Sequence, residues 1–176
     1  MQKRTLAAFV IITIICFFHS QLHATSAEIR PSSGKELCSA LTAAEFTKAG
    51  ITFVSANNFN IDNDSSAYCS YNTNTGIVEL DIFYPAGDTP DGVLATERTV
   101  WAEVGGKFEP ITIPGADSAK INLAVPGKKP SASIAVRKNT AVFTINIPTN
   151  PNVKQELLTL SQTILNRLPS SSPSHK

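Results

Sequence analysis

The sequence predicts an α+β fold in which helices cover an antiparallel sheet, and three patterns lead to this prediction. Residues 77–84 alternate apolar and charged side chains, which is typical of a strand with one covered face. Residues 152–168 repeat apolar side chains at helical spacing. The predicted order is helix, hairpin, helix, strands, helix, so the strands are grouped rather than alternating with helices. With 176 residues, the chain has the length of one domain with its own core.

Residues 1–27 have the three-part pattern of a secretory signal peptide. Lys3 and Arg4 precede an apolar run over residues 5–18, and the small residues Ala24 and Ala27 offer cleavage sites. The alternative is an uncleaved membrane anchor, but the apolar run is shorter than the roughly 20 residues that span a bilayer. We therefore expect cleavage between Ala24 and Ala27, a secreted or periplasmic protein, and no stable membrane span after cleavage.

The mature chain would keep two of the three cysteines, Cys38 and Cys69. Cys16 falls in the signal peptide, and Ile15 stands before it where a lipoprotein signal needs a small residue. In an oxidising compartment an even number of cysteines favours a disulfide. A zinc site would need further ligands, and a redox pair would have Cys-x-x-Cys spacing. We predict a Cys38–Cys69 disulfide that ties the first helix to the first hairpin.

A single domain is expected over residues 28–168, beginning with a polar leader at 28–36. Its first helix starts at a capping box formed by Thr42 and Glu45 and stops at Gly50. The segments that follow are a short strand at Ile51–Val54, a polar loop at Asn57–Ser66, and a hairpin at Tyr68–Tyr84 that turns at Asn72–Gly76.

The second half of the domain is predicted to contain two helices and three strands. The first helix spans Asp91–Val104, and we interpret its Trp101 as a core residue, with a ligand platform as the alternative. The final helix spans Asn152–Leu168, and residues 169–176 should be a disordered tail. Between the two helices lie a loop or edge segment at Phe108–Ser118 and strands at Ala119–Val125, Ser131–Arg137 and Thr140–Pro148, the last two joined tightly at Lys138-Asn139.

Charge and histidine content exclude several functions. Loss of the signal peptide leaves 13 basic and 14 acidic residues, unlike the strongly basic surface of a nucleic-acid-binding protein. The three histidines, His19, His23 and His175, all lie outside the predicted domain. The domain therefore lacks the commonest general base and metal ligand, so Ser-His-Asp and Cys-His catalysis are excluded.

Two acidic patterns could support other chemistry. Glu79 and Asp81 lie two residues apart on one strand face, about 7 Å from each other. This separation is close to that of the two catalytic carboxyl groups of a glycosidase. We interpret them as a solvated strand face. Residues 60–64 resemble the start of a calcium loop, yet Ser65 and Tyr71 stand where glycine and glutamate are required. We therefore predict no metal, no cofactor and no enzymatic activity.

Several short motifs resemble a family of secreted bacterial proteins and lipoproteins of unknown function. That family has a Cys-Leu-Leu-Thr-x-x-Glu helix, a Cys-x-Tyr strand, a Gly-x-x-Ala segment, a Val-Arg-Lys-Gly hairpin and a closing helix. The counterparts here are Cys38–Phe46, Cys69-Ser70-Tyr71, Gly115–Ala119, Val136–Asn139 and Thr159–Leu168. The resemblance implies a PsbP-like sandwich and carries no catalytic residue. Asn139 replaces the turn glycine, which is tolerated because asparagine accepts a left-handed conformation.

The disulfide, the helix cap and the core account for most of the distinctive residues. We therefore predict a non-catalytic extracytoplasmic binding or scaffolding protein whose partner is a protein of the cell envelope. The alternative is a periplasmic immunity or inhibitor protein that blocks a secreted toxin or hydrolase. An enzyme that uses Glu79 and Asp81 is the third hypothesis. No pattern in the sequence indicates an oligomeric state.

Overall fold

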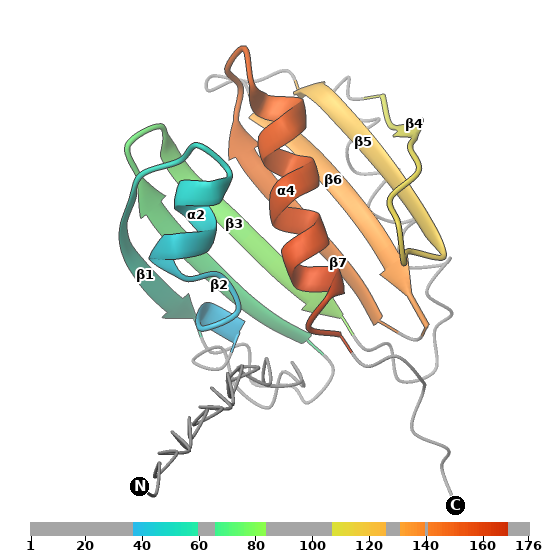
Figure 1. Cartoon of the computed structure of the whole chain (residues 1–176), viewed down its shortest axis with the longest axis horizontal. Coiled ribbons are helices and arrows are strands. Elements are labelled where there is room, and N and C mark those ends of the chain that lie inside the picture. The colour runs from blue at the N-terminus through green and yellow to red at the C-terminus, as the bar shows by residue number, and fades with distance from the viewer. Residues whose placement is uncertain (1–36, 60–65, 84–106, 126–130, 140, 169–176) are drawn as a thin grey trace, which may run out of the picture.

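The computed structural model describes residues 37–59, 66–83, 107–125, 131–139 and 141–168. These residues form a seven-stranded antiparallel sheet with helices packed on one face (Figure 1), which confirms the α+β class. The elements are α2 (Ala43–Lys48), β1 (Phe53–Phe59), β2 (Ser66–Thr73), β3 (Gly76–Phe83), β4 (Glu109–Pro110), β5 (Ser118–Val125), β6 (Ser131–Lys138), β7 (Ala141–Pro148) and α4 (Val153–Leu165).

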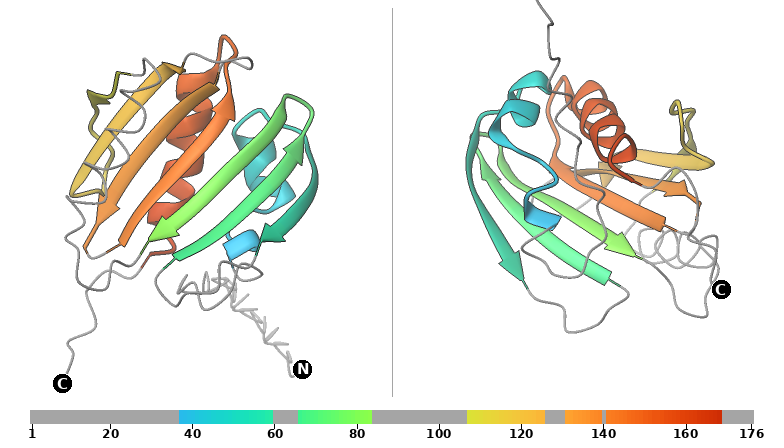
Figure 2. Two further views of the ribbon diagram at one scale, coloured as in Figure 1. Left: turned by 180° about the vertical axis from the view of Figure 1, so that it is seen from behind. Right: turned by 60° about the horizontal axis from the view of Figure 1, so that its bottom comes forward.

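The strand order is β1-β2-β3-β7-β6-β5-β4. Two meanders, β1 to β3 and β4 to β7, therefore meet at the centre of the sheet, where β3 pairs with β7. Figure 2 shows the sheet from behind, with β1 and β4 at its two margins. The predicted signal peptide, the leader, the helix at 91–104 and the tail lie outside the described residues.

The first helix follows from local sequence signals, as predicted. The backbone N–H of Thr42 donates to the Glu45 carboxylate at 2.6 Å, which supplies one half of a capping box. The helix ends at Lys48, and Gly50 adopts a φ of +83°, a left-handed conformation that glycine accepts without steric cost. Phe46 is the buried anchor of α2, and its ring lies 5.1 Å from that of Tyr71.

The predicted polar loop at Asn57–Ser66 is wrong at both ends. Strand β1 continues to Phe59 and β2 already begins at Ser66, so only residues 60–65 separate the strands, and these lie outside the described residues. Asn57 pairs with Ser70, and the next residue pairs with Cys69. Pairing with a neighbouring strand thus outweighs the low strand preference of asparagine.

The core lies between the sheet and the helices. One row of buried side chains crosses five strands in register, from the first meander into the second: Cys69, Leu80, Ile145, Ile134 and Ile121. The stripe predicted for the final helix covers this layer and is confirmed except at Leu158, which is only partly buried. Its buried members are Val153, Leu157, Ser161, Ile164, Leu165 and Leu168. The prediction missed Leu160 and Glu156, both of which are buried.

The sequence predicts that only one face of the sheet is covered, but the face away from the helices is also covered in part. On β3, Glu79 and Asp81 are half-buried there. On β6 and β7, however, Ala135 and Val142 are fully buried on this face, with Phe108 packed against them. The prediction was drawn from β3, whose charges mark the less covered part of this face. It therefore does not hold for the central strands β6 and β7.

The side chain of Lys138 secures the C-terminal end of α4. The ammonium group of Lys138, on β6, donates to the carbonyls of Leu165 at 2.8 Å and Leu168 at 3.0 Å. Carbonyls at the end of a helix have no partner within it, and a positive charge there also complements the helix dipole. The turn before β7 is tight, and Asn139 takes the predicted left-handed conformation with a φ of 54°.

Arg167, just beyond the end of α4, joins this end of the chain to α2 and to the segment before it. Its guanidinium donates to the carbonyl of Ser39 at 3.1 Å and to that of Ala40, and it forms an ion pair with Glu45. Glu45 also caps α2, so one carboxylate serves both the helix start and the contact between the helices.

Candidate functional site

The two predicted site cysteines are bonded to each other. Cys38 and Cys69 form a disulfide with their Cα atoms 5.3 Å apart, a normal separation for such a bond. Cys69 is fully buried on the core face of β2. Two residues further on, the hydroxyl of Tyr71 donates to the carbonyl of Leu37 at 3.1 Å. This disulfide ties the segment before α2 to the first hairpin, as predicted.

The predicted carboxylate pair lies on the face of the sheet away from the helices. Glu79 accepts a hydrogen bond from the hydroxyl of Tyr68 at 2.8 Å, and Asp81 accepts one from the hydroxyl of Thr144 at 3.4 Å. Burial raises the pKa of Tyr68 well above its ordinary value, and the hydrogen bond to Glu79 raises it further. The hydroxyl of Tyr68 therefore keeps its proton even in alkaline solution and acts as a donor to Glu79.

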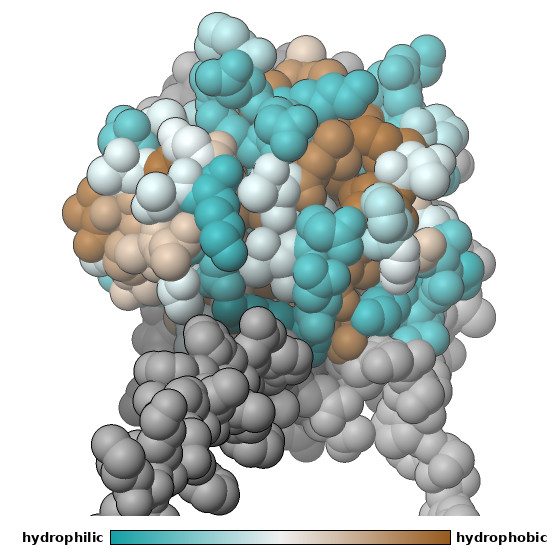
Figure 3. Space-filling model, in the orientation of Figure 1, coloured by the Kyte–Doolittle hydropathy of each residue, from teal (hydrophilic) through white to brown (hydrophobic). Residues whose placement is uncertain are grey.

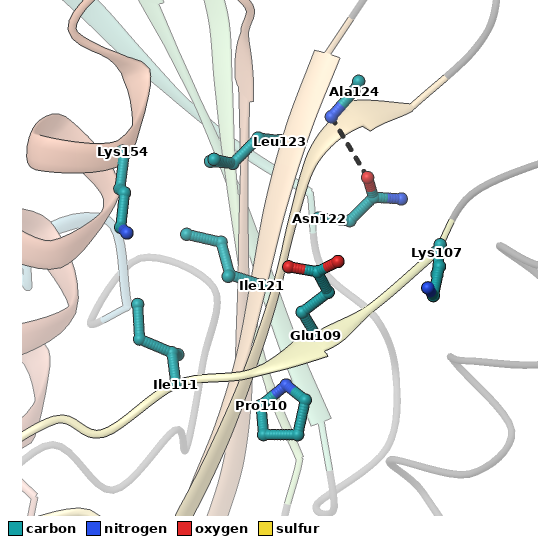
Figure 4. A pocket seen from close by; sticks show the side chains of 9 residues that line it. All are labelled: Lys107, Glu109, Pro110, Ile111, Ile121, Asn122, Leu123, Ala124 and Lys154. Atoms are coloured by element: carbon teal, nitrogen blue, oxygen red, sulfur yellow. Dashed lines mark hydrogen bonds between the residues drawn. The ribbon is translucent and has the colours of Figure 1, made fainter.

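A groove runs along the edge of the sheet where β4 ends. Its volume is about 370 Å³, within the range of sites that hold a small ligand or a side chain of a partner. Figure 4 shows its lining, which comes from the β4 segment, the end of β5 and the start of α4: Lys107, Glu109, Pro110, Ile111, Ile121, Asn122, Leu123, Ala124 and Lys154.

The floor of the groove follows from the local geometry of β5. Ile121 and Leu123 both point toward α4, and Leu123 is 38% exposed (Figure 4). Asn122 points to the other face, where its side-chain oxygen accepts from the N–H of Ala124 at 3.1 Å. A bulge between Asn122 and Val125 shifts the register with β6, and bulges often re-aim side chains beside sites. Within the helix-bearing face, Figure 3 shows apolar surface between α4 and β5.

Residues 111–117 form one wall of the groove, and a hydrogen bond that lies outside the groove holds this segment against α4. The side-chain nitrogen of Gln162 donates to the carbonyl of Pro114 at 3.2 Å, and Ile113 is buried in the core. The backbone N–H of Asn139 donates to Asp117 at 2.6 Å at the other end of this segment. These contacts fix the position of residues 111–117, so Ile111 lies across the hollow from Leu123 (Figure 4).

Three charges surround the apolar floor. Lys154 lies on the α4 side of the edge, Lys107 lies on the opposite side, and Glu109 lies between them (Figure 4). Lys154 occupies the first turn of α4, where the helix dipole disfavours a cation. Its position is therefore not explained by the stability of α4. The groove as a whole can accept an apolar group flanked by anionic ones.

Sequence reasoning did not find the groove. Its residues come from two neighbouring strand segments and from α4, which follows β5 only after two further strands, and no local pattern joins Lys154 to Leu123. The only local signal was the strand prediction for Ala119–Val125, in which Leu123 would share a face with Ile121 but remains exposed.

Within the described ranges there is no group of three or more histidine, cysteine, aspartate or glutamate side chains arranged to hold a metal ion. None of the helices in that part of the chain is long and apolar enough to cross a membrane. The chain matches no family model, no curated protein and no solved structure. The resemblance to the family of secreted bacterial proteins and lipoproteins, and the PsbP-like fold that it implies, stay predictions.

Proposed function

We propose that this protein is a non-catalytic extracytoplasmic binding protein that takes a protein partner of the cell envelope in the groove between β5 and α4. The observation that carries the proposal is the groove itself, with an apolar floor at Ile121 and Leu123 and ammonium groups on both sides of the sheet edge. A partner that offers an apolar side chain next to acidic residues matches this lining.

The remaining chemistry of the described residues supports binding rather than catalysis. The carboxylates of Glu79 and Asp81 each accept a hydrogen bond from a hydroxyl of a neighbouring strand. Cys38 and Cys69 are engaged in the disulfide, which favours an oxidising compartment. An immunity or inhibitor protein would use the same groove, with a toxin or hydrolase as the partner.

The test compares two exposed aliphatic side chains on strands. Leu123 lies in the groove, whereas Ile77 is 54% exposed on β3 and takes no part in it. The mature protein and its Leu123→Asp and Ile77→Asp variants are used as bait for envelope proteins of the native host.

The same preparation should show a mature N-terminus between Thr25 and Glu28.

We expect Leu123→Asp to reduce capture of the specific partner about tenfold or more, because a carboxylate would be placed on the apolar floor. Ile77→Asp should leave capture unchanged. Circular dichroism confirms that both variants fold. Equal capture by the wild type and the folded Leu123→Asp variant would show that the groove does not hold the partner.

A further inference from the structure

We propose that β1 is a homodimerisation edge, where β1 of one copy pairs antiparallel with β1 of a second copy across a twofold axis. The two seven-stranded sheets would then form one continuous sheet. This inference is independent of the groove, which lies at the opposite margin (Figure 1).

Of the two edges of the sheet, only the β4 edge has features that block pairing with a further strand. At one edge, β4 has only two residues, Glu109 and Pro110, and the charged residue Lys107 lies shortly before them. Short edge strands, proline and charges are the usual means by which proteins block strand addition. At the other edge, β1 has seven residues, and no strand of the described chain lies beyond it.

Strand β1 has none of these protective side chains. Its sequence, Phe-Val-Ser-Ala-Asn-Asn-Phe, contains no charged residue and no proline. Val54 is 65% exposed, and Ala56 and Asn57 are also exposed. The one interruption is a bulge between Phe53 and Ser55, which leaves regular pairing with β2 from Ser55 to the end of the strand. The exposed edge is therefore long, uncharged and regular around Ala56.

The composition of β1 suits a pair with the same strand of a second copy. In an antiparallel pair centred on Ala56, that residue meets its own twofold mate, and Ser55 meets Asn57. Alanine at the axis brings no steric clash, and no like charges meet across the pair, which is the usual obstacle to pairing a strand with itself.

The test measures the oligomeric state of the mature protein by sedimentation velocity. Because one pair of edge strands forms a small interface, the expected dimer is weak, and the series should extend to about 200 µM protein. Ala56→Lys places two ammonium groups at the axis and should raise the dissociation constant of the dimer at least tenfold. Ala124→Lys is the matched control, since Ala124 is also exposed on a strand but lies at the other margin.

A second variant gives a positive readout. Ala56→Cys should form a covalent dimer through residue 56 under mild oxidation, because a twofold axis brings the two Cα atoms within disulfide range. Ala124→Cys should not. The proposal is overturned if the wild type is monomeric throughout the series. It is also overturned if Ala56→Lys and Ala124→Lys dimerise equally, or if the two cysteine variants cross-link at equal rates.

Discussion

The disulfide between Cys38 and Cys69 is expected to be a large single contribution to stability. It closes a loop with a sequence separation of 31 residues. In the chain-entropy treatment, a loop of this length restricts the unfolded state by about 4 kcal/mol. The double variant Cys38→Ala/Cys69→Ala also removes a fully buried sulfur from the core, which adds a smaller packing loss.

The assay is equilibrium urea unfolding followed by far-UV circular dichroism. Without the disulfide the free energy of unfolding should fall by about 4 kcal/mol, and thermal unfolding should shift down by about 10 °C or more. The dependence of this free energy on urea should become steeper, because an unfolded chain without the cross-link exposes more surface.

Reductant provides the matched control for this prediction. A reducing agent should destabilise the wild type by a similar amount and leave the double variant unchanged. If fully reduced wild type loses less than about 1 kcal/mol, the unfolded state was not restricted by the bond, and the chain-entropy argument is refuted.

Two further predictions concern the contacts of α2. Arg167→Met should cost about 2 kcal/mol, because the pair with Glu45 is mostly buried, with side chains 19% and 12% exposed, and two carbonyls lose their donor. Combined with Glu45→Gln, which can still cap α2, it should cost less than the sum of the single variants, and strict additivity would exclude direct coupling. Burial raises the pKa of Tyr71 above its ordinary value, so the stabilisation linked to its proton is complete below about pH 10 and lost as pH rises further. At pH 7, Tyr71→Phe should be about 1 kcal/mol less stable than the wild type, because it loses the hydrogen bond to the carbonyl of Leu37. Urea titrations should show this difference in unfolding free energy becoming smaller above pH 10, where the wild type loses the stabilisation linked to the tyrosine proton. A difference that stays constant with pH would contradict the raised pKa.

Features of the fold that depend on a few neighbouring residues could be predicted from the sequence. The capping box at Thr42 and Glu45, the left-handed Asn139 and the second strand of the first hairpin each follow from local chemistry. The disulfide could also be predicted, because Cys16 falls in the predicted signal peptide and the rest of the sequence contains only Cys38 and Cys69.

Features that depend on tertiary pairing could not be predicted in the same way. Asn57 lies in a strand because Ser70 pairs with it across β2, and nothing near Asn57 in the sequence indicates this. Glu156 is buried although it is a charged residue type, and the side chain of Asn150 compensates by donating a hydrogen bond to its carboxyl group at 2.8 Å. The covered reverse face of β7 and the groove likewise depend on segments that meet only in the folded chain.

The two proposed contact surfaces lie at opposite margins of one sheet, and this arrangement has a consequence for binding. A dimer joined through β1 would carry its two grooves at the outer ends of a continuous sheet, so neither contact would obstruct the other. Two grooves on one particle would bind a repetitive or oligomeric envelope partner more tightly than a single groove, without any new contact. Ala56→Lys should then weaken capture of such a partner although it leaves the groove intact. Capture of a monomeric partner should be unaffected by Ala56→Lys and reduced by Leu123→Asp.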